Sequence, residues 1–545
     1  MCDILDNSLI FYYFLGTVLV LGLSFVIYLL FTYYDINISA RVLYIFLICS
    51  VYMFIAQLLR YWSLHLSVDF SHWAQLIYSI SATGKPFVLS QELLVSGTIN
   101  YLSVHFSPLV YALAIPFKVW PFSETIITLN FLLMVSAAVP MYKLALICQG
   151  NKRFALHMVV FLLWYPTFQY VVMYEFEMLR FSIPIILWML YYFEKSNMPW
   201  YYFFAFLAVL VREEVGLTIM MFGIYLLIVK KQRRAGLVTA LLGLCSFIVI
   251  TQMIMPALRG GDGYQHIAMS AFRDFGNSAG DIIINIVKNP LLVLRTVLKP
   301  IRLANTYMYF LPLLFIPFLV PAVLISILAS FGIGLLSKPL TYVSFMLYYM
   351  SPAIPFIFYG LIKAWPKFLA MLEAFHKSNY RIKQRNNMDS AAMATVLSSI
   401  LVANIIFGPS IISLQFWFKD LRPAPFRTQD FHYSAYKFTD HHRLSDEFCK
   451  LIPESAVVSA SQFLYPQLFK KRGTMSFPKL VSSDGALKAN YVIFDKTNNG
   501  LKRNSPAYLN QGDFDLVERD TKNWNLVRSK DGYFLYKNKN IQFDP

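Results

Sequence analysis

The stretch from Tyr61 to Pro108 holds the residues best suited to chemistry. Asp69 lies between His65 and His72, and the stretch ends in the motif His105-Phe106-Ser107-Pro108. A carboxylate at the mouth of a helix bundle can take a proton from an incoming hydroxyl or hold a metal ion, and both uses require a position near the hydrocarbon but outside it. The alternative is a solvated loop aspartate with no chemical role.

Two further groups of charged residues interrupt apolar runs. Glu175 and Glu177 come shortly before Arg180, and Arg212-Glu213-Glu214 stands inside what would otherwise be one long helix broken near Gly216. Ionisable residues in such places usually face a cavity or one another. Two alternatives stay open. Glu177 and Arg180 are spaced for a structural ion pair, and the second group fits a solvated turn between two short helices.

A basic segment runs from residue 259 to residue 303. It opens with Arg259 and a glycine-rich turn, and Arg295, Lys299 and Arg302 follow among leucines and valines at helical spacing. This pattern predicts an amphipathic helix at the membrane interface that could clamp a phosphate. A helix that only anchors the chain to lipid headgroups has the same pattern.

The elements that must position these residues are membrane helices. The chain has 545 residues, of which 57% are hydrophobic and 14% charged, and its mean hydropathy is +0.53. This composition excludes an ordinary soluble domain and predicts a polytopic membrane protein. The net charge of +17 comes from Lys and Arg in short loops between apolar runs, a pattern typical of cytoplasmic retention and not of nucleic-acid binding.

Several function classes lack their motifs. There is no Walker loop, no Rossmann glycine pattern, no His-Glu-x-x-His helix and no Gly-x-Ser-x-Gly elbow. The five cysteines are scattered and form neither a disulfide framework nor a zinc pattern. The sequence therefore offers no support for ATP-driven pumping or metalloprotease chemistry.

Apolar runs long enough to cross about 30 Å of hydrocarbon lie near 11–34, 41–61, 125–147, 155–173, 235–257, 321–337, 342–363 and 391–417. Shorter or broken runs lie near 107–121, 179–194, 200–213, 214–230 and 306–320. Together they predict roughly 12–13 transmembrane helices. The segment 107–121 contains two prolines and is expected to dip into the membrane without crossing it.

Basic clusters predict the orientation of the chain. Lys152-Arg153, residues 230–234 and residues 376–385 should be cytoplasmic. The loops at 62–106, 174–178, 212–214 and 259–303, and everything after residue 419, then share the opposite side. The polar groups described above would thus face the same compartment.

After residue 418 the composition becomes that of a soluble domain. The patterns predict a helix at 441–451, a strand at 456–460, a helix at 462–470, a strand at 491–495 and two or three strands between 514 and 536. We therefore expect a membrane domain over 1–418 and a small α/β domain over 419–545.

The order of these motifs resembles a known family. The motifs that carry the resemblance are Asp69-Phe70, His105 to Pro108, Glu175-Phe176-Glu177, Arg212-Glu213-Glu214, Pro256 before a glycine-rich segment, Ile452 to Ala460, and Ala489 to Asp495. In this order they resemble a bacterial family of predicted multipass membrane proteins of unknown function, which is itself similar to the GT-C superfamily of lipid-sugar glycosyltransferases. The resemblance covers about residues 60–540.

The resemblance implies a GT-C-like fold and an inverting transfer of a sugar from a polyprenyl-phosphate carrier at the outer face of the inner membrane. It implies that Asp69 acts as base or metal ligand, with Mg²⁺ or Mn²⁺ as the metal if there is one, and that Glu177 is a second acidic catalytic residue. The residues we expect to bind substrate are His72, His105, Glu175, Arg212, Glu213, Arg259, Arg295, Lys299 and Arg302. The sequence departs from the family's pattern at Glu175-Phe176-Glu177, where Asp and His are common, and at Tyr348-Tyr349, where a His is expected.

A second hypothesis is a transporter or an envelope-assembly scaffold that has a GT-C-like fold and no catalysis. The two hypotheses differ in geometry. A catalyst requires Asp69, Glu177 and Arg212 to converge on one site, whereas a scaffold allows them to lie on separate surfaces.

Overall fold

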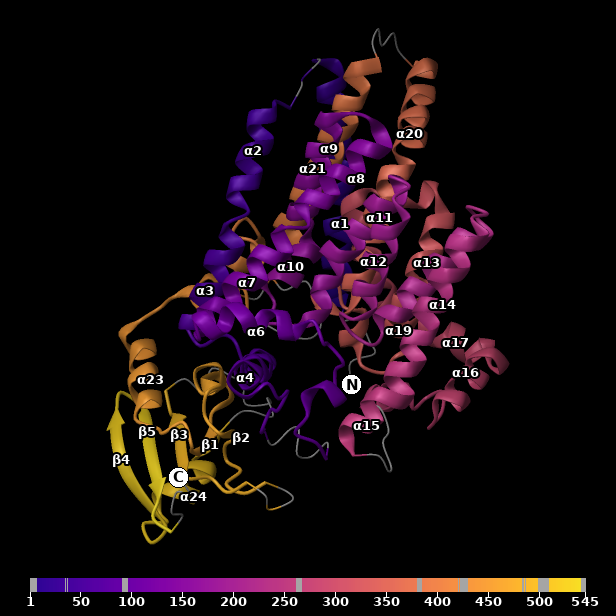
Figure 1. Cartoon of the computed structure of the whole chain (residues 1–545). Coiled ribbons are helices and arrows are strands. Elements are labelled where there is room, and N and C mark those ends of the chain that lie inside the picture. Colours follow the sequence, from indigo (N-terminus) through magenta and orange to yellow (C-terminus); the bar gives the residue numbers. More distant parts are fainter. Residues whose placement is uncertain are drawn as a thin grey trace.

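The computed structural model describes residues 7–34, 36, 38–90, 97–260, 267–379, 385–419, 421, 430–482, 485, 487–497 and 509–540. It consists of a tall bundle of helices with a small sheet-containing domain at one end (Figure 1). The two parts follow the predicted change in composition near residue 418.

The bundle is built from α-helices and short 3-10 or π segments. The α-helices are α1 (Asn7–Tyr33), α2 (Ala40–Cys49), α3 (Tyr52–Trp62), α4 (Val68–Thr83), α6 (Val110–Val119), α7 (Ser123–Val135), α8 (Ala138–Gln149), α9 (Lys152–Trp164), α10 (Pro166–Met173), α11 (Ser182–Glu194), α12 (Met198–Val209), α13 (Val215–Ile228), α14 (Arg233–Val249), α15 (Met255–Arg259), α16 (Ala279–Lys288), α17 (Pro290–Val297), α18 (Pro300–Met308), α19 (Leu328–Leu336), α20 (Ile354–Asn379), α21 (Arg385–Phe407) and α22 (Leu414–Trp417). The short segments are η1 (Tyr101–Ser103), η2 (Met178–Phe181), η3 (Ile250–Ile254), η4 (Ile267–Phe272), η5 (Leu311–Leu313), η6 (Ile316–Leu319), η7 (Pro321–Ile327), η8 (Leu340–Val343) and η9 (Tyr348–Ala353).

Fewer helices than predicted are long enough to cross a membrane. Within the described residues six helices meet the length and hydropathy requirement, or seven if the bent pair α9–α10 counts as one span. The prediction of 12–13 spans counted apolar runs, and many of these runs form shorter or broken helices such as α12, α13 and η7–α19. Prolines and the charged group at 212–214 shorten them.

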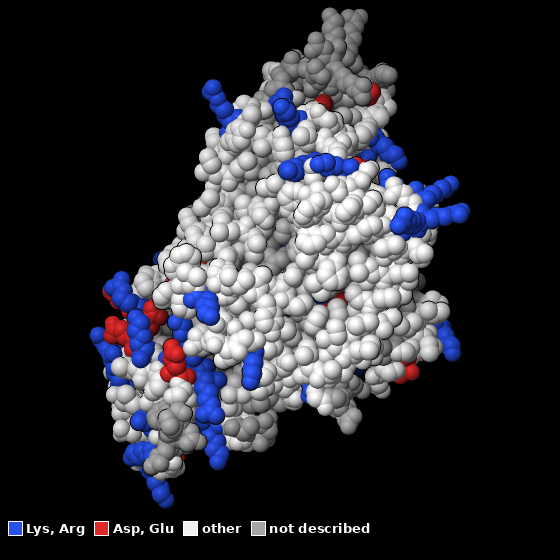
Figure 2. Space-filling view, in the orientation of Figure 1, with Lys and Arg blue, Asp and Glu red and all other residues white. Residues whose placement is uncertain are grey.

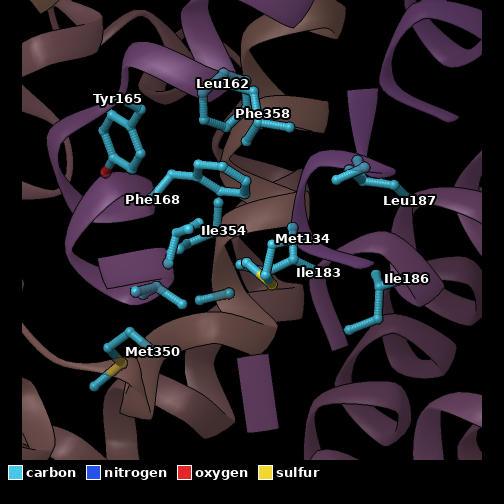
Figure 3. Close-up of a cluster of buried hydrophobic side chains, with 14 of the residues drawn as sticks. Met134, Leu162, Tyr165, Phe168, Ile183, Ile186, Leu187, Met350, Ile354 and Phe358 are labelled. Atoms are coloured by element: carbon cyan, nitrogen blue, oxygen red, sulfur yellow. The ribbon is translucent and has the colours of Figure 1, made fainter. Parts of the chain in front are cut away.

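Charged residues avoid the middle of the bundle. In Figure 2 Lys, Arg, Asp and Glu gather toward the two ends, and a broad band between them is almost free of charge. Apolar side chains fill the interior behind this surface. Figure 3 shows one such cluster, to which α9 contributes Leu162, α11 contributes Ile183 and α20 contributes Ile354 and Phe358. A band of this kind is typical of the hydrocarbon-crossing part of a membrane protein.

The small domain contains α23 (Asp440–Lys450), η11 (Gln462–Gln467), α24 (Gln511–Glu518) and five strands, and η10 (Tyr433–Tyr436) precedes it. The strands are β1 (Val457–Ala460), β2 (Gly473–Ser476), β3 (Tyr491–Asp495), β4 (Trp524–Lys530) and β5 (Tyr533–Asn538), in the order β2-β1-β3-β5-β4. β1 is parallel to β2 and β3, and β5 is antiparallel to β3 and β4.

The small α/β domain was predicted, but two of its elements were not. The start of the predicted 514–536 strand region is the helix α24, which Asn510 caps through a reciprocal pair of hydrogen bonds with Asp513. Strand β2 was missed because it is only four residues long and begins with a glycine. The remaining strands lie close to their predicted positions.

Helix α4 joins the bundle to the small domain. Ser71 Oγ donates a hydrogen bond to the Tyr465 carbonyl at 3.1 Å, and Gln75 Nε2 donates to the Lys471 carbonyl at 3.1 Å. Beyond the helix, Thr474 N of β2 donates to the Leu89 carbonyl at 3.1 Å. The face of α4 that carries Ser71 and Gln75 is therefore covered by the small domain.

Two predicted outer loops contain more structure than expected. The segment 62–106 was predicted as a loop, but it holds α4 and η1, so Asp69 lies in the first turn of a helix. The segment 259–303 was predicted to carry one amphipathic helix, but prolines at helix starts divide it into α16, α17 and the beginning of α18. Helix α6 has ten residues, about 15 Å, which agrees with a segment that enters the membrane without crossing it.

Candidate functional site

The amino end of α4 lies against the loop that follows α10. Glu175 Oε1 accepts a hydrogen bond from Ser67 Oγ at 2.7 Å, and Glu175 Oε2 accepts one from the backbone N–H of Phe70 at 3.0 Å. Glu175 thus satisfies a free N–H of the first helical turn, where the helix dipole also favours a negative charge. Burial and then the charge of Asp69 raise the pKa of Glu175, and the two hydrogen bonds offset part of the rise.

Asp69 is held by one oxygen. The phenol of Tyr174 donates a hydrogen bond to Asp69 Oδ2 at 2.5 Å. Asp69 is partly exposed, and its Oδ1 accepts no hydrogen bond from any described residue. The carboxylate is therefore fixed in orientation while one oxygen keeps the capacity to accept a proton.

A series of neighbouring tyrosine rings leads to this carboxylate. The ring of Tyr174 lies 5.0 Å from that of Tyr348, Tyr348 lies 4.3 Å from Tyr349, and Tyr349 lies 4.4 Å from Tyr342. Tyr174 and Tyr348 come from the loop after α10 and from η9, and Tyr348 is buried whereas Tyr349 and Tyr342 are partly exposed. The aromatic faces could stack on the apolar face of a ring-shaped substrate.

Arg212 is the cation at the centre of the acidic groups. It is 5% exposed. Its guanidinium lies 3.2 Å from Glu177 Oε1, 3.3 Å from Glu214 Oε2 and 3.8 Å from Glu213 Oε1, and 5.9 Å from the ring centre of Tyr348. The predicted break between α12 and α13 is confirmed, and its charges point into the protein instead of forming a solvated turn.

Glu177 pairs with Arg212 and not with Arg180. Its Oε2 accepts a hydrogen bond from Trp73 Nε1 at 3.3 Å, and its Oε1 accepts one from the Met178 N–H at 3.0 Å. Arg180 instead donates to Asn130 Oδ1 at 2.9 Å. The i,i+3 spacing suggested a pair that the 3-10 geometry of η2 does not form. Since both Glu177 oxygens are engaged, Asp69 is the better proton acceptor.

His105 bridges the end of its motif to the Arg212 group. Arg212 Nη2 donates to His105 Nδ1 at 2.9 Å, and the N–H of Phe106 donates to Glu213 Oε2 at 2.9 Å. His72 is buried on α4, with its ring centre 6.0 Å from that of Tyr101.

Asp69, Glu177 and Arg212, which a catalyst requires at one site, lie near one another in the structure. Tyr101 in η1 lies close enough to Asp69, Glu177 and Arg212 to interact with the charge of each. We call the group formed by Asp69, Tyr174, Tyr348, Glu177 and Arg212 the Asp69 site.

The other predicted basic residues lie outside this group. Arg302 is buried and donates to the carbonyls of Gly334 and Leu335 at 3.1 and 2.9 Å, at the carboxyl end of α19, where a cation is favoured. Arg295 is exposed on α17, and Lys299 is the residue before α18. Arg259 ends α15, which packs against η1, the segment that holds Tyr101.

A divalent metal was expected as an option, with Asp69 as a ligand. Within the described part of the chain no group of three or more His, Cys, Asp or Glu side chains is arranged to hold a metal ion. Mg²⁺ and Mn²⁺ need several oxygen ligands. Asp69 offers one, while both oxygens of Glu175 and of Glu177 accept hydrogen bonds from protein donors. A metal at Asp69 stays a prediction.

Several residues of the site were not among the predicted ones. Tyr174, Tyr348 and Trp73 are aromatic residues in an aromatic-rich chain, and spacing alone does not distinguish them. Arg60 is fully buried and donates to the carbonyls of Met173 at 2.7 Å and His65 at 3.3 Å, which ties together the two segments that enter the site. Its position inside an apolar run was the one signal that could have identified it.

This chain resembles known proteins in its fold and in its sequence family. Solved structures with similar folds include ArnT from Cupriavidus metallidurans bound to undecaprenyl phosphate, with 12% identity, a TM-score of 0.47, and coverage of 92% of this chain and 98% of that one. The archaeal oligosaccharyltransferase AglB from Archaeoglobus fulgidus, in complex with an inhibitory peptide and a dolichol-phosphate, has 13% identity, a TM-score of 0.41, and coverage of 82% and 69%. No curated protein matches. The model of the predicted membrane protein family DUF2079 matches residues 60–535, which confirms the family expected from the motifs, and the chain is a member of that family of membrane proteins.

Proposed function

We propose that this protein is an integral membrane glycosyltransferase that moves a sugar from a polyprenyl-phosphate donor to an acceptor hydroxyl. The observation that carries the proposal is the position of Asp69. It is a partly exposed carboxylate with one oxygen fixed by Tyr174 and the other without a hydrogen bond from the described residues. Helix α4, which carries it, lies at the end of the bundle next to the small domain (Figure 1).

In the proposed reaction Asp69 is the general base. The acceptor O–H gives its proton to Asp69 Oδ1, and the acceptor oxygen forms a bond to the anomeric carbon of the sugar. The bond between that carbon and the phosphate oxygen breaks, and its electron pair leaves with the polyprenyl phosphate. Attack opposite the leaving group inverts the anomeric centre. A positioned base contributes on the order of 10²–10⁴ to such a rate.

The remaining residues of the site hold this geometry. Glu175 fixes the amino end of α4, and therefore the backbone that carries Asp69. Arg212 is neutralised by carboxylates, so its proposed role is to orient Glu177 and His105. Arg259 is the proposed contact for the leaving phosphate, because its helix packs against η1 and guanidinium groups match phosphate oxygens. The outer face of the inner membrane is the proposed side of the reaction.

Asp69→Asn in the purified full-length protein, reconstituted in nanodiscs, tests the proposal. Asn preserves the volume but cannot accept the proton at neutral pH. A panel of polyprenyl-phosphate donors, each with a radiolabelled sugar, would be supplied with extracted membrane lipids and glycans as acceptors. We expect transfer from at least one donor and a loss of 10²–10⁴-fold in the variant.

Asp274→Asn is the matched control, because Asp274 is an exposed aspartate outside the site and should retain full activity. Full activity in Asp69→Asn would remove Asp69 from the mechanism. If no donor gave transfer, and the variant behaved as the parent protein in cells, the transporter or scaffold hypothesis would replace the enzyme.

A further inference from the structure

Helices α16 and α17 present an apolar surface that the rest of the protein does not cover. On α16 the exposed side chains include Ile283, Ile284 and Val287, which are 63%, 50% and 74% exposed. On α17 no residue is buried, although the helix reads Pro-Leu-Leu-Val-Leu-Arg-Thr-Val. A surface of this kind in contact with water would be strongly unfavourable.

The inward side of the pair is attached to the protein. Ile282 is buried, Asn285 Nδ2 donates to the Phe275 carbonyl at 2.7 Å, and α17 packs against α19. The outward direction of Ile283, Ile284 and Val287 is therefore fixed by contacts on the opposite side of the helix.

A candidate membrane span precedes this helix pair in the chain. It runs over Arg233–Arg259, and its exposed side chains include Leu241 and Ile248 on α14 and Met253 in η3. In Figure 1 α16 and α17 lie at about the level of α4 and α6, where the bundle meets the small domain. This is the level at which the charge-free band of Figure 2 ends.

Basic residues flank the apolar ones. Lys288 ends α16 and Arg295 lies in the last turn of α17, and both are exposed. Between residues 270 and 299 there are four basic and two acidic residues. Apolar side chains with long cations beside them are the pattern of a helix that lies in the plane of a membrane interface.

We propose that α16 and α17 lie flat in the interface of an anionic bilayer, with Ile284, Leu291 and Leu294 among the acyl chains and with Lys288 and Arg295 on lipid headgroups. The inference is independent of the proposed glycosyl transfer. It assigns to this helix pair a lipid-binding surface in addition to the spans.

The first test compares two leucines of similar exposure in different surroundings. Leu294 on α17 is 52% exposed and Leu526 on β4 is 46% exposed. A genetically encoded, environment-sensitive fluorophore would be placed at either position in the full-length protein in nanodiscs. We expect the probe at position 294 to be quenched by brominated lipid and protected from aqueous iodide, and the probe at 526 to show the reverse. Iodide quenching at 294 equal to that at 526 would overturn the proposal.

Val287 and Leu516, which are 74% and 49% exposed, form a second pair in case either first probe disturbs folding.

The second test concerns lipid charge. Brominated phosphatidylglycerol should quench the probe at 294 more strongly than brominated phosphatidylcholine at the same mole fraction, because each cation near an anionic surface enriches the lipid by about fivefold. The double variant Lys288→Gln with Arg295→Gln should make the quenching by the two brominated lipids equal. Equal quenching in the parent protein would refute the preference for anionic lipid.

Discussion

Tyr174 donates a hydrogen bond to Asp69 Oδ2 across 105 positions of sequence, and this contact decides which oxygen of Asp69 is left for chemistry. The two residues come from different elements, the loop after α10 and the first turn of α4. Neither segment alone would fix the carboxylate. The site is therefore a property of the packed bundle.

Tyr174→Phe removes this hydrogen bond and keeps the ring that contacts Tyr348. Hydrogen bonds to charged groups contribute about 1.5–3 kcal/mol, and about 1.4 kcal/mol corresponds to tenfold in rate. We expect the transfer rate to fall on the order of tenfold with little change in KM. Tyr433→Phe, at an exposed tyrosine, should leave the rate unchanged. An unchanged rate in Tyr174→Phe would mean that the tyrosine does not orient the base.

Arg212→Gln should destabilise the protein strongly. It leaves the carboxylates of Glu177, Glu213 and Glu214 without their shared cation, and the loss of one partner of a buried charge group costs about 3–5 kcal/mol. Thermal unfolding in detergent, followed by tryptophan fluorescence, should show a lower midpoint. Adding Glu177→Gln should recover part of the loss.

Arg443→Gln provides the comparison, because Arg443 forms an exposed pair with Asp440 and such pairs contribute little. If Arg212→Gln unfolded at the same midpoint as Arg443→Gln, the Arg212 group would not be a stabilising unit.

His441 makes the small domain sensitive to pH. Its Nε2–H donates to Asp495 Oδ2 at 2.8 Å and its Nδ1–H donates to Asp531 Oδ2 at 2.7 Å. Burial lowers the pKa of His441, but the two carboxylates outweigh it and the pKa is raised above its usual value of 6.5. The stabilisation is therefore complete below pH 6.5 and is lost as pH rises through the folded-state pKa.

Hydrogen exchange of the full-length protein should accordingly speed up in α23 and in the β4–β5 hairpin as pH increases from 6 to 8, after correction for intrinsic exchange. His441→Asn should remove this dependence, whereas His432→Asn, at a histidine of the preceding linker, should preserve it. A pH dependence that survives in His441→Asn would have to come from another group.

The two ends of the bundle should face different compartments. The loop between α13 and α14 carries the basic cluster at 230–234, and it lies at the end of α14 opposite to α15 and the small domain in Figure 1. Reporter fusions at Gln232 and at Asn538 are expected to give opposite signals, with Gln232 cytoplasmic. Identical signals would contradict this orientation.

Hydropathy predicted the gross architecture well. Seven of the eight long apolar runs correspond to long helices or to the bent pair α9–α10, because the need to satisfy backbone groups in lipid leaves helices as the main solution. The exception is 321–337, where Pro321 begins a 3-10 segment before α19. Counting every apolar run as a span gave a larger number than the six or seven helices of the described residues that meet the length requirement, since hydropathy does not reveal where a helix stops short.

The site was predicted only in part. Asp69, Glu177 and Arg212 stood out because a charge in an apolar neighbourhood is costly and requires a reason. Their partners could not be inferred, since the Glu177–Arg212 pair joins the residue before η2 to the break between α12 and α13, whereas the sequence suggested Arg180. Arg302 shows the same limit. Its spacing predicted a phosphate ligand, but its guanidinium donates hydrogen bonds to the carbonyls at the end of α19.

Helix α4 carries Asp69 and Trp73 toward the site and Ser71 and Gln75 toward the small domain. This arrangement orders events during biosynthesis. A nascent chain whose residues 457–476 have not yet emerged has every membrane span up to α21 but nothing to bond the second face of α4. Asp69 therefore reaches its final surroundings only after the small domain has been made and has folded against α4.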